Sequence, residues 1–168
     1  MARRVVILAC GNDGRRDDGL GVLAAERIEA MAFPGAEVIV AHQFQPEHAT
    51  YLQEADLAVF IDAADLIETP CVLQELAAAE GRSTFSHAMS AQQVLAVQRR
   101  LDPLHVPPAF MLAIRGTDFG LGFGLSARAE RDLDQALALV RRMLERPDAL
   151  YWRQLGDREF LAAGKIES

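Results

Sequence analysis

The chain has 168 residues, about half of them hydrophobic, and a formal net charge of −7 at pH 7. This length is typical of one globular domain that buries a sizeable core. The acidic balance argues against a nucleic-acid partner, which needs a basic face. No apolar run is long enough for a membrane span or a secretory signal. Two cysteines, Cys10 and Cys71, form no disulfide framework and favour a reducing, cytoplasmic location.

The first third of the chain alternates apolar strands with helices. A buried strand is predicted at Val5–Ala9, an amphipathic helix at Leu20–Met31 and a second strand at Glu37–Ala41. A short helix is predicted at Pro46–Ala55, because proline is favoured in the first turn of a helix. The apolar run Leu57–Asp62 predicts a third strand, which ends in an acid.

The same alternation continues to residue 144. A fourth strand is predicted at Cys71–Leu76, near a sheet edge because Pro70 precedes it. A helix at Ser90–Leu101 and a fifth strand at Phe110–Ile114 follow. Ser126 is the expected N-cap of a long helix. That helix carries one apolar stripe, formed by Leu133, Leu137, Val140 and Leu144.

This order of elements predicts an α/β fold, a three-layer α/β/α sandwich around a mostly parallel, twisted sheet of five strands. Residues 1–168 are expected to form a single domain. Residues 145–168 show no clear pattern and are expected to form a C-terminal tail. In that tail, Trp152, Leu155 and Phe160 are candidates for packing against the body of the domain.

The segment between the first strand and the first helix carries two adjacent acids. It contains Gly11 and Asn12 and then, after four further residues, Asp17 and Asp18. These acids lie where a strand ends and a helix begins, which is the edge at which open parallel sheets bind ligands. Paired acids there can hold a cation or transfer a proton. One of the two could instead favour the start of the helix electrostatically, so we expect a division of labour.

Two further strand ends carry candidate ligands. Asp62 ends the third strand, and His87 lies in a polar loop after the fourth. Together with Asp18, these residues suit a divalent ion such as nickel, zinc or manganese and leave a coordination position open. Singly, Asp62 could serve in a turn and His87 at the surface. Their expected gathering at one sheet edge favours a site.

Other segments carry weaker signals. The glycine-rich loop from Gly116 to Gly124 lacks the lysine of a phosphate-binding loop. It is expected either to shape a substrate groove or to act as a simple connection. Cys10 is more typical of a small buried thiol than of a nucleophile.

These motifs resemble, in order, those of the nickel-iron hydrogenase maturation endopeptidases. The resemblance extends from about residue 5 to about residue 144. Its parts are the strand followed by Gly11-Asn12 and Asp17-Asp18-Gly19, the strand that ends at Asp62, the pair Ser86-His87, and Gly124-Leu125-Ser126. Arg15 and the segment 42–47 are closer to the branch that serves cytoplasmic NAD-reducing hydrogenases. The pair Asp13-Gly14 departs from the apolar or proline-containing pair of many relatives.

The resemblance implies a metal-dependent endopeptidase. Its substrate would be a hydrogenase large-subunit precursor, which loses a C-terminal extension after nickel insertion. Asp18, Asp62 and His87 match the residues that contact the nickel, which the substrate is expected to supply. The loop would be shaped by Gly11, Asn12 and Asp17. Either the nickel polarises the scissile carbonyl, or it serves recognition while a carboxylate acts as general base; the sequence leaves both routes open.

Two alternatives belong to other functional classes. A signalling receiver domain also places paired acids after its first strand and one acid after its third. Here, however, Arg115 stands at the end of the fifth strand, where such a site uses lysine. The other alternative is a non-catalytic, nickel-binding maturation chaperone, which abundant histidine would favour; the chain has four.

Overall fold

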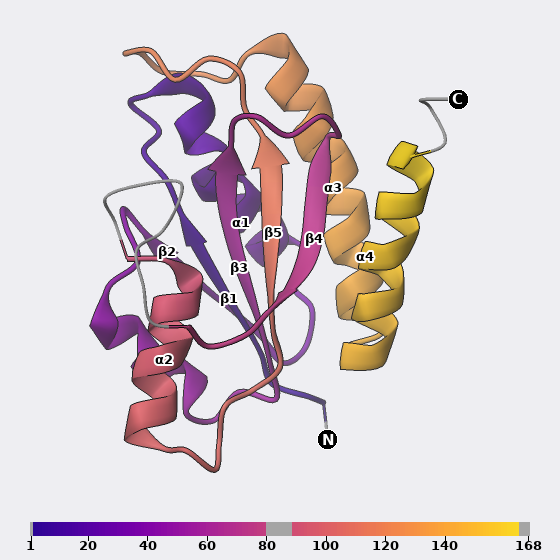
Figure 1. Ribbon diagram of the computed structural model, residues 1–168. Coiled ribbons are helices and arrows are strands. Elements are labelled where there is room, and N and C mark those ends of the chain that lie inside the picture. Colours follow the sequence, from indigo (N-terminus) through magenta and orange to yellow (C-terminus); the bar gives the residue numbers. More distant parts are fainter. Residues whose placement is uncertain (1, 80–88, 165–168) are drawn as a thin grey trace.

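A five-stranded sheet with helices on both faces forms the body of the molecule (Figure 1). The structure is a computed structural model that describes residues 2–79 and 89–164. The strand order is β2-β1-β3-β5-β4. The expected α/β fold with a mostly parallel sheet is therefore confirmed. Ser86 and His87 lie outside the described residues.

Four strands run parallel: β1 (Val5–Cys10), β2 (Ala36–Ala41), β3 (Leu57–Ala64) and β5 (Ala109–Arg115). β1 lies near the centre of the sheet and is buried at all six positions. Both of its faces are covered, which explains why its sequence is continuously apolar instead of alternating. β3 extends past Asp62, where the sequence predicted its end.

The edge strand β4 (Cys71–Leu76) is antiparallel to β5. It lies at the edge, as predicted, but its carboxyl end lies opposite the carboxyl ends of β1, β3 and β5. The prediction that His87 lies at their edge assumed that β4 runs parallel to the other strands, and this assumption about β4 is wrong. The reason is the short connection of residues 65–70, since a parallel crossover needs a dozen or more residues.

Helices cover both faces of the sheet. α1 (Leu20–Ala30) and α3 (Ala127–Glu145) pack together on one face. α2 (Ala91–Leu101) and the 3-10 helix η2 (Pro46–Leu52) pack together on the other. Side chains of β1 alternate between the two cores, since successive residues of a strand point to opposite faces.

The C-terminal segment is a helix, α4 (Ala149–Gly164), where the sequence predicted a tail without pattern. Trp152 and Leu155 are buried, as expected, while the side chain of Phe160 lies outside the described part. The Trp152 indole packs edge-on against Phe110, with ring centroids 5.3 Å apart, and its Nε1–H donates to the Met143 carbonyl oxygen at 2.9 Å. α4 is thus part of the core.

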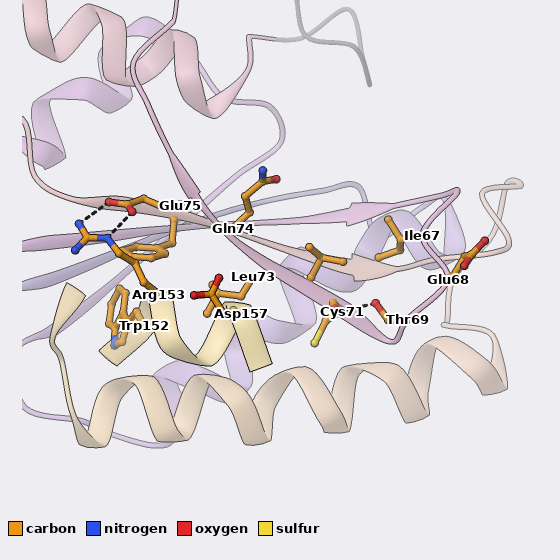
Figure 2. A pocket seen from close by; sticks show the side chains of 13 residues that line it. Ile67, Glu68, Thr69, Cys71, Leu73, Gln74, Glu75, Trp152, Arg153 and Asp157 are labelled. Carbon is orange, nitrogen blue, oxygen red and sulfur yellow. Dashed lines mark hydrogen bonds and ion pairs between the residues drawn. The ribbon is translucent and has the colours of Figure 1, made fainter. Parts of the chain in front are cut away.

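A cavity of about 660 Å³ lies between β4 and α4 (Figure 2). Trp152 and Phe110 contribute to its lining, and Arg153 on α4 forms a two-pronged ion pair with Glu75 on β4 beside it. Neither Asp18 nor Asp62 lines this cavity. Within residues 2–79 and 89–164, no helix is long and apolar enough to cross a membrane.

The contact between α4 and β4 depends on a glycine, whose lack of a side chain lets the two backbones approach closely. A Cβ atom added to Gly156 would lie 2.6 Å from the carbonyl oxygen of Leu73. We expect Gly156→Val to lower the free energy of unfolding by about 2 kcal/mol, because the backbone of β4 cannot yield as a side chain can. Urea denaturation measures this change. The matched control is Gln154→Val at an exposed position of α4, and equal stability of the two variants would contradict the close packing.

Candidate active site

The carboxyl ends of β1 and β3 form the switch point of the sheet. From β1 the chain passes through α1 to β2 on one side, and β3 pairs with the other side of β1. Open sheets bind ligands in the crevice at such a point. The β1–β3 pairing ends at Ala9 and Ile61, whereas β3 continues beside β5. Cys10 and Asp62 therefore lie together at the switch point of the sheet.

A tight reversal of the chain brings Asp18 back to the end of β1. The Asn12 N–H donates to the Asp18 carbonyl oxygen at 3.0 Å, and Asn12 Oδ1 accepts from the Gly14 N–H at 3.0 Å. A side chain on Gly11 would collide with the Asp18 carbonyl group, and one on Gly21 with that of Cys10. Glycine at these two positions permits the close approach.

Asp17 is fully buried and its carboxylate is engaged within the protein, so it is not available as a metal ligand. Its carboxylate accepts hydrogen bonds from the backbone N–H groups of Thr117 and Asp118, both at 2.9 Å, and of Ser126 at 2.7 Å. The Ser126 hydroxyl donates a further bond at 2.8 Å. Burial alone would raise the pKa of Asp17, but these hydrogen bonds together lower it. The ionised group holds the glycine-rich loop.

Asp18 and Asp62 are both partly buried and close enough to interact. The pKa of Asp62 is raised to about 6, chiefly by burial. A hydrogen bond from the Cys10 thiol opposes this shift, whereas the negative charge of Asp18 adds to it. The two adjacent acids thus differ in their surroundings: Asp17 is fully paired with donors, while Asp18 lies close to a second carboxylate.

Cys10 is a member of this cluster that the sequence did not assign to it. The thiol is buried, and burial together with the charges of Asp62 and Asp18 raises its pKa far above the ordinary value. It therefore stays protonated and donates to Asp62 instead of acting as a nucleophile. A signal lay in the sequence, because Cys10 directly follows the predicted first strand and Asp62 ends the predicted third, and these two strands pair in parallel.

Two carboxylates in one crevice repel each other unless a proton or a cation lies between them. In the described ranges, no group of three or more His, Cys, Asp and Glu side chains is arranged to hold a metal ion. Asp18 and Asp62 are therefore two anionic oxygen donors, and a cation bound between them would need further ligands. Such a pair can bind a divalent cation in that way, or act on a proton.

Arg115, at the end of β5, is engaged in a structural contact. Its guanidinium forms a two-pronged ion pair with Asp132 of α3, with Nε–Oδ2 at 2.8 Å and Nη2–Oδ1 at 3.1 Å. It also donates to the carbonyl oxygen of Glu68 in the β3–β4 connection. The pair is buried and fixes the carboxyl end of β5 to α3.

Comparison with known proteins shows the fold. No protein-family model and no curated protein sequence matches the chain. Among solved structures, the [NiFe] hydrogenase maturation protease HycI from Thermococcus kodakarensis KOD1 matches with a TM-score of 0.65 and 22% identity, over 85% of this chain and 93% of that one. HybD from Escherichia coli matches with a TM-score of 0.67 and 18% identity, over 84% and 92%. The chain therefore shares the fold of these maturation proteases.

The carboxylate of Asp17 is expected to be essential for stability. Asp17→Asn places an amide NH₂ against backbone donors, so we expect a loss of about 3 kcal/mol in the free energy of unfolding at pH 7. Urea denaturation provides the measurement, with the exposed neighbour Asp13→Asn as matched control. A loss no greater than that of the control would show that the hydrogen bonds to Asp17 do not hold the loop.

Asp62 is expected to destabilise the metal-free protein at neutral pH. Its pKa is raised from 3.8 to about 6 on folding, so between these values the folded state binds more protons than the unfolded state. The free energy of unfolding therefore falls as pH rises through this window, and the penalty is complete at pH 7. We expect Asp62→Asn to be more stable by about 1–2 kcal/mol at pH 7, a figure reduced for partial exposure.

The gain from Asp62→Asn should disappear at about pH 3, where the carboxyl group of the unsubstituted protein is mostly protonated in both the folded and the unfolded state. Thermal unfolding of the chelator-treated protein at about pH 3 and pH 7 measures both values. Asp65→Asn, an exposed acid in the β3–β4 connection, is the control and should show no such dependence. A pH-independent difference for Asp62→Asn would contradict the raised pKa.

Proposed function

We propose that the protein is an endopeptidase that removes the C-terminal extension of a nickel-iron hydrogenase large-subunit precursor after nickel insertion. The observation that carries the proposal is the meeting of Asp18 and Asp62 at the switch point of a sheet with the maturation-protease fold. The first of the sequence motifs that resemble this family lies beside this pair: Gly11, Asn12 and Asp17 build the loop that carries Asp18.

In this proposal the nickel belongs to the substrate. Asp18 and Asp62 would contact it as anionic oxygen ligands, because a divalent charge relieves their mutual repulsion. His87 would add a neutral nitrogen donor. The assignment of His87 rests on the sequence motif alone, since this residue lies outside the described part of the chain. Cleavage would then depend on metal loading, because the unloaded precursor lacks the ion that joins it to the site.

Two chemical routes fit this arrangement. The nickel can act as a Lewis acid on the scissile carbonyl group, which makes it easier for water to attack. Alternatively, one of the two carboxylates takes a proton from the attacking water, and the nickel serves for recognition only. In both routes, Asp17 acts at a distance by holding the loop that positions Asp18.

The alternative functions are less well supported. A receiver domain has the strand order 2-1-3-4-5. Here the order is β2-β1-β3-β5-β4, and Arg115 is bound to Asp132 where a receiver site needs lysine. A nickel chaperone would bind a loaded precursor without cutting it. We further propose a cytoplasmic location and, from Arg15 and the segment 42–47, a partner from the NAD-reducing branch of hydrogenases.

The decisive experiment is a cleavage assay with the large-subunit precursors encoded in the same genome, each nickel-loaded and nickel-free. We expect mass spectrometry to show loss of a C-terminal peptide from one nickel-loaded precursor only. Asp18→Ala, Asp62→Ala and His87→Ala should each lower the cleavage rate by about a hundredfold or more, because each removes a group from the reacting centre.

Asp65→Ala is the matched control for this assay, since Asp65 is an exposed acid close to Asp62 in sequence. It should cleave at the native rate. Binding of loaded precursor without any cleavage would instead support the chaperone, and labelling by acyl phosphate would support the receiver. Normal processing by all three site variants would show that the site is wrongly assigned.

A further inference from the structure

The glycine-rich loop before α3 presents two large apolar side chains to solvent. Leu121 and Phe123 are 80% and 81% exposed. On either side of them, Phe119 is only partly exposed and Leu125 packs against the core. The outer apolar residues thus anchor the loop, while the inner two point outward. We call Leu121 and Phe123 the apolar tip.

Hydrogen bonds hold the backbone of the apolar tip in place. Gly122, between the two exposed residues, donates its N–H to the Gly14 carbonyl oxygen at 3.0 Å. Its own carbonyl oxygen accepts from the Arg16 N–H at 2.9 Å. At the two ends of the loop, Asp17 binds Thr117 and Ser126. A backbone fixed in this way loses little further conformational entropy when a partner covers the side chains that it carries.

The apolar tip lies beside the candidate site. The residues that bind Gly122 belong to the connection that leads directly to Asp18. In Figure 1, this loop lies above the connection from β1 to α1, at the edge where the parallel strands end. A polypeptide that reaches Asp18 and Asp62 from solvent therefore arrives at the edge that carries the tip.

Charges around the tip are already engaged within the protein. Arg16 Nε lies 3.6 Å from Asp118 Oδ2, and the Arg15 guanidinium donates to the Phe119 carbonyl oxygen at 3.1 Å. A partner that covers the tip would thus meet apolar area flanked by two arginines that already have partners within the protein. Exposed apolar side chains grouped in this way are typical of protein-binding surfaces.

We propose that the apolar tip is the docking surface for an apolar patch on the protein substrate, close to the segment that is cleaved. This inference rests on the proposed function and adds to it the surface that recognises the substrate. Asp18 and Asp62 would act on the bound segment, whereas Leu121 and Phe123 would set how tightly the precursor is held. Loss of the tip should therefore affect KM and leave kcat nearly unchanged.

The test compares the double variant Leu121→Ser/Phe123→Ser with Leu104→Ser. Leu104 is 96% exposed in the connection from α2 to β5, at the opposite edge of the sheet, and is the matched control. We expect the double variant to raise KM for the nickel-loaded precursor at least tenfold, with kcat within about twofold. The control should change neither value, and both variants should keep the native unfolding midpoint.

Binding of immobilised precursor, measured in the same series, separates this inference from the proposed function. If the native protein binds the precursor without cleaving it, the proposed function fails. The docking surface is still supported in that case if the double variant binds more weakly and the control does not. Native affinity and native KM in the double variant would overturn the docking surface. So would a native dimer that the double variant converts to a monomer, because a second copy of the chain would then cover the tip. Absence of both binding and cleavage by the native protein would overturn both proposals.

Discussion

The buried carboxylate of Asp17 is the group on which the geometry of this edge depends. A buried charge without partners would be very unfavourable, but among the described residues the donors to Asp17 come from the loop before α3. One ionised group therefore satisfies the backbone of that loop and fixes the segment that carries Asp18. The position of the candidate site and the shape of the surface around it are set by the same interaction.

The neighbouring pair of acids shows the opposite arrangement. Asp18 and Asp62 lie close enough for their charges to interact, and the donors to Asp62 within the described part of the chain are a thiol and one backbone N–H. Such an arrangement costs stability in the absence of a cation, and proteins keep it where binding or catalysis requires it. The difference between Asp17 and Asp18 arises entirely from their partners, since the two residues are adjacent and chemically identical.

The sequence predicted the parts of the fold that depend on local pattern. The apolar runs indicated β1 as a buried strand and β3 as a further strand, and Ser126 indicated the start of α3; the structure confirms each. The meeting of Asp18 and Asp62 follows from parallel strands ending at one edge. The direction of β4 was missed although the short connection before it carried the signal. α4 could not be predicted, because its fit depends on a partner strand distant in sequence, and neither could the pairing of Arg115 with Asp132.

The bonds to Asp17 also determine when the site can form. They join residues that are 100 to 109 positions apart in the chain. Contacts of such long sequence separation form late, because a large loop must close before they contribute any stability. During synthesis, the segment with Asp17 and Asp18 leaves the ribosome early, yet the carboxylate of Asp17 lacks its bonding partners until Thr117, Asp118 and Ser126 have followed. A nascent or truncated chain that ends before Ser126 therefore carries the acids of the candidate site without all the bonds that hold Asp17, and these bonds are complete only when three quarters of the chain has been made.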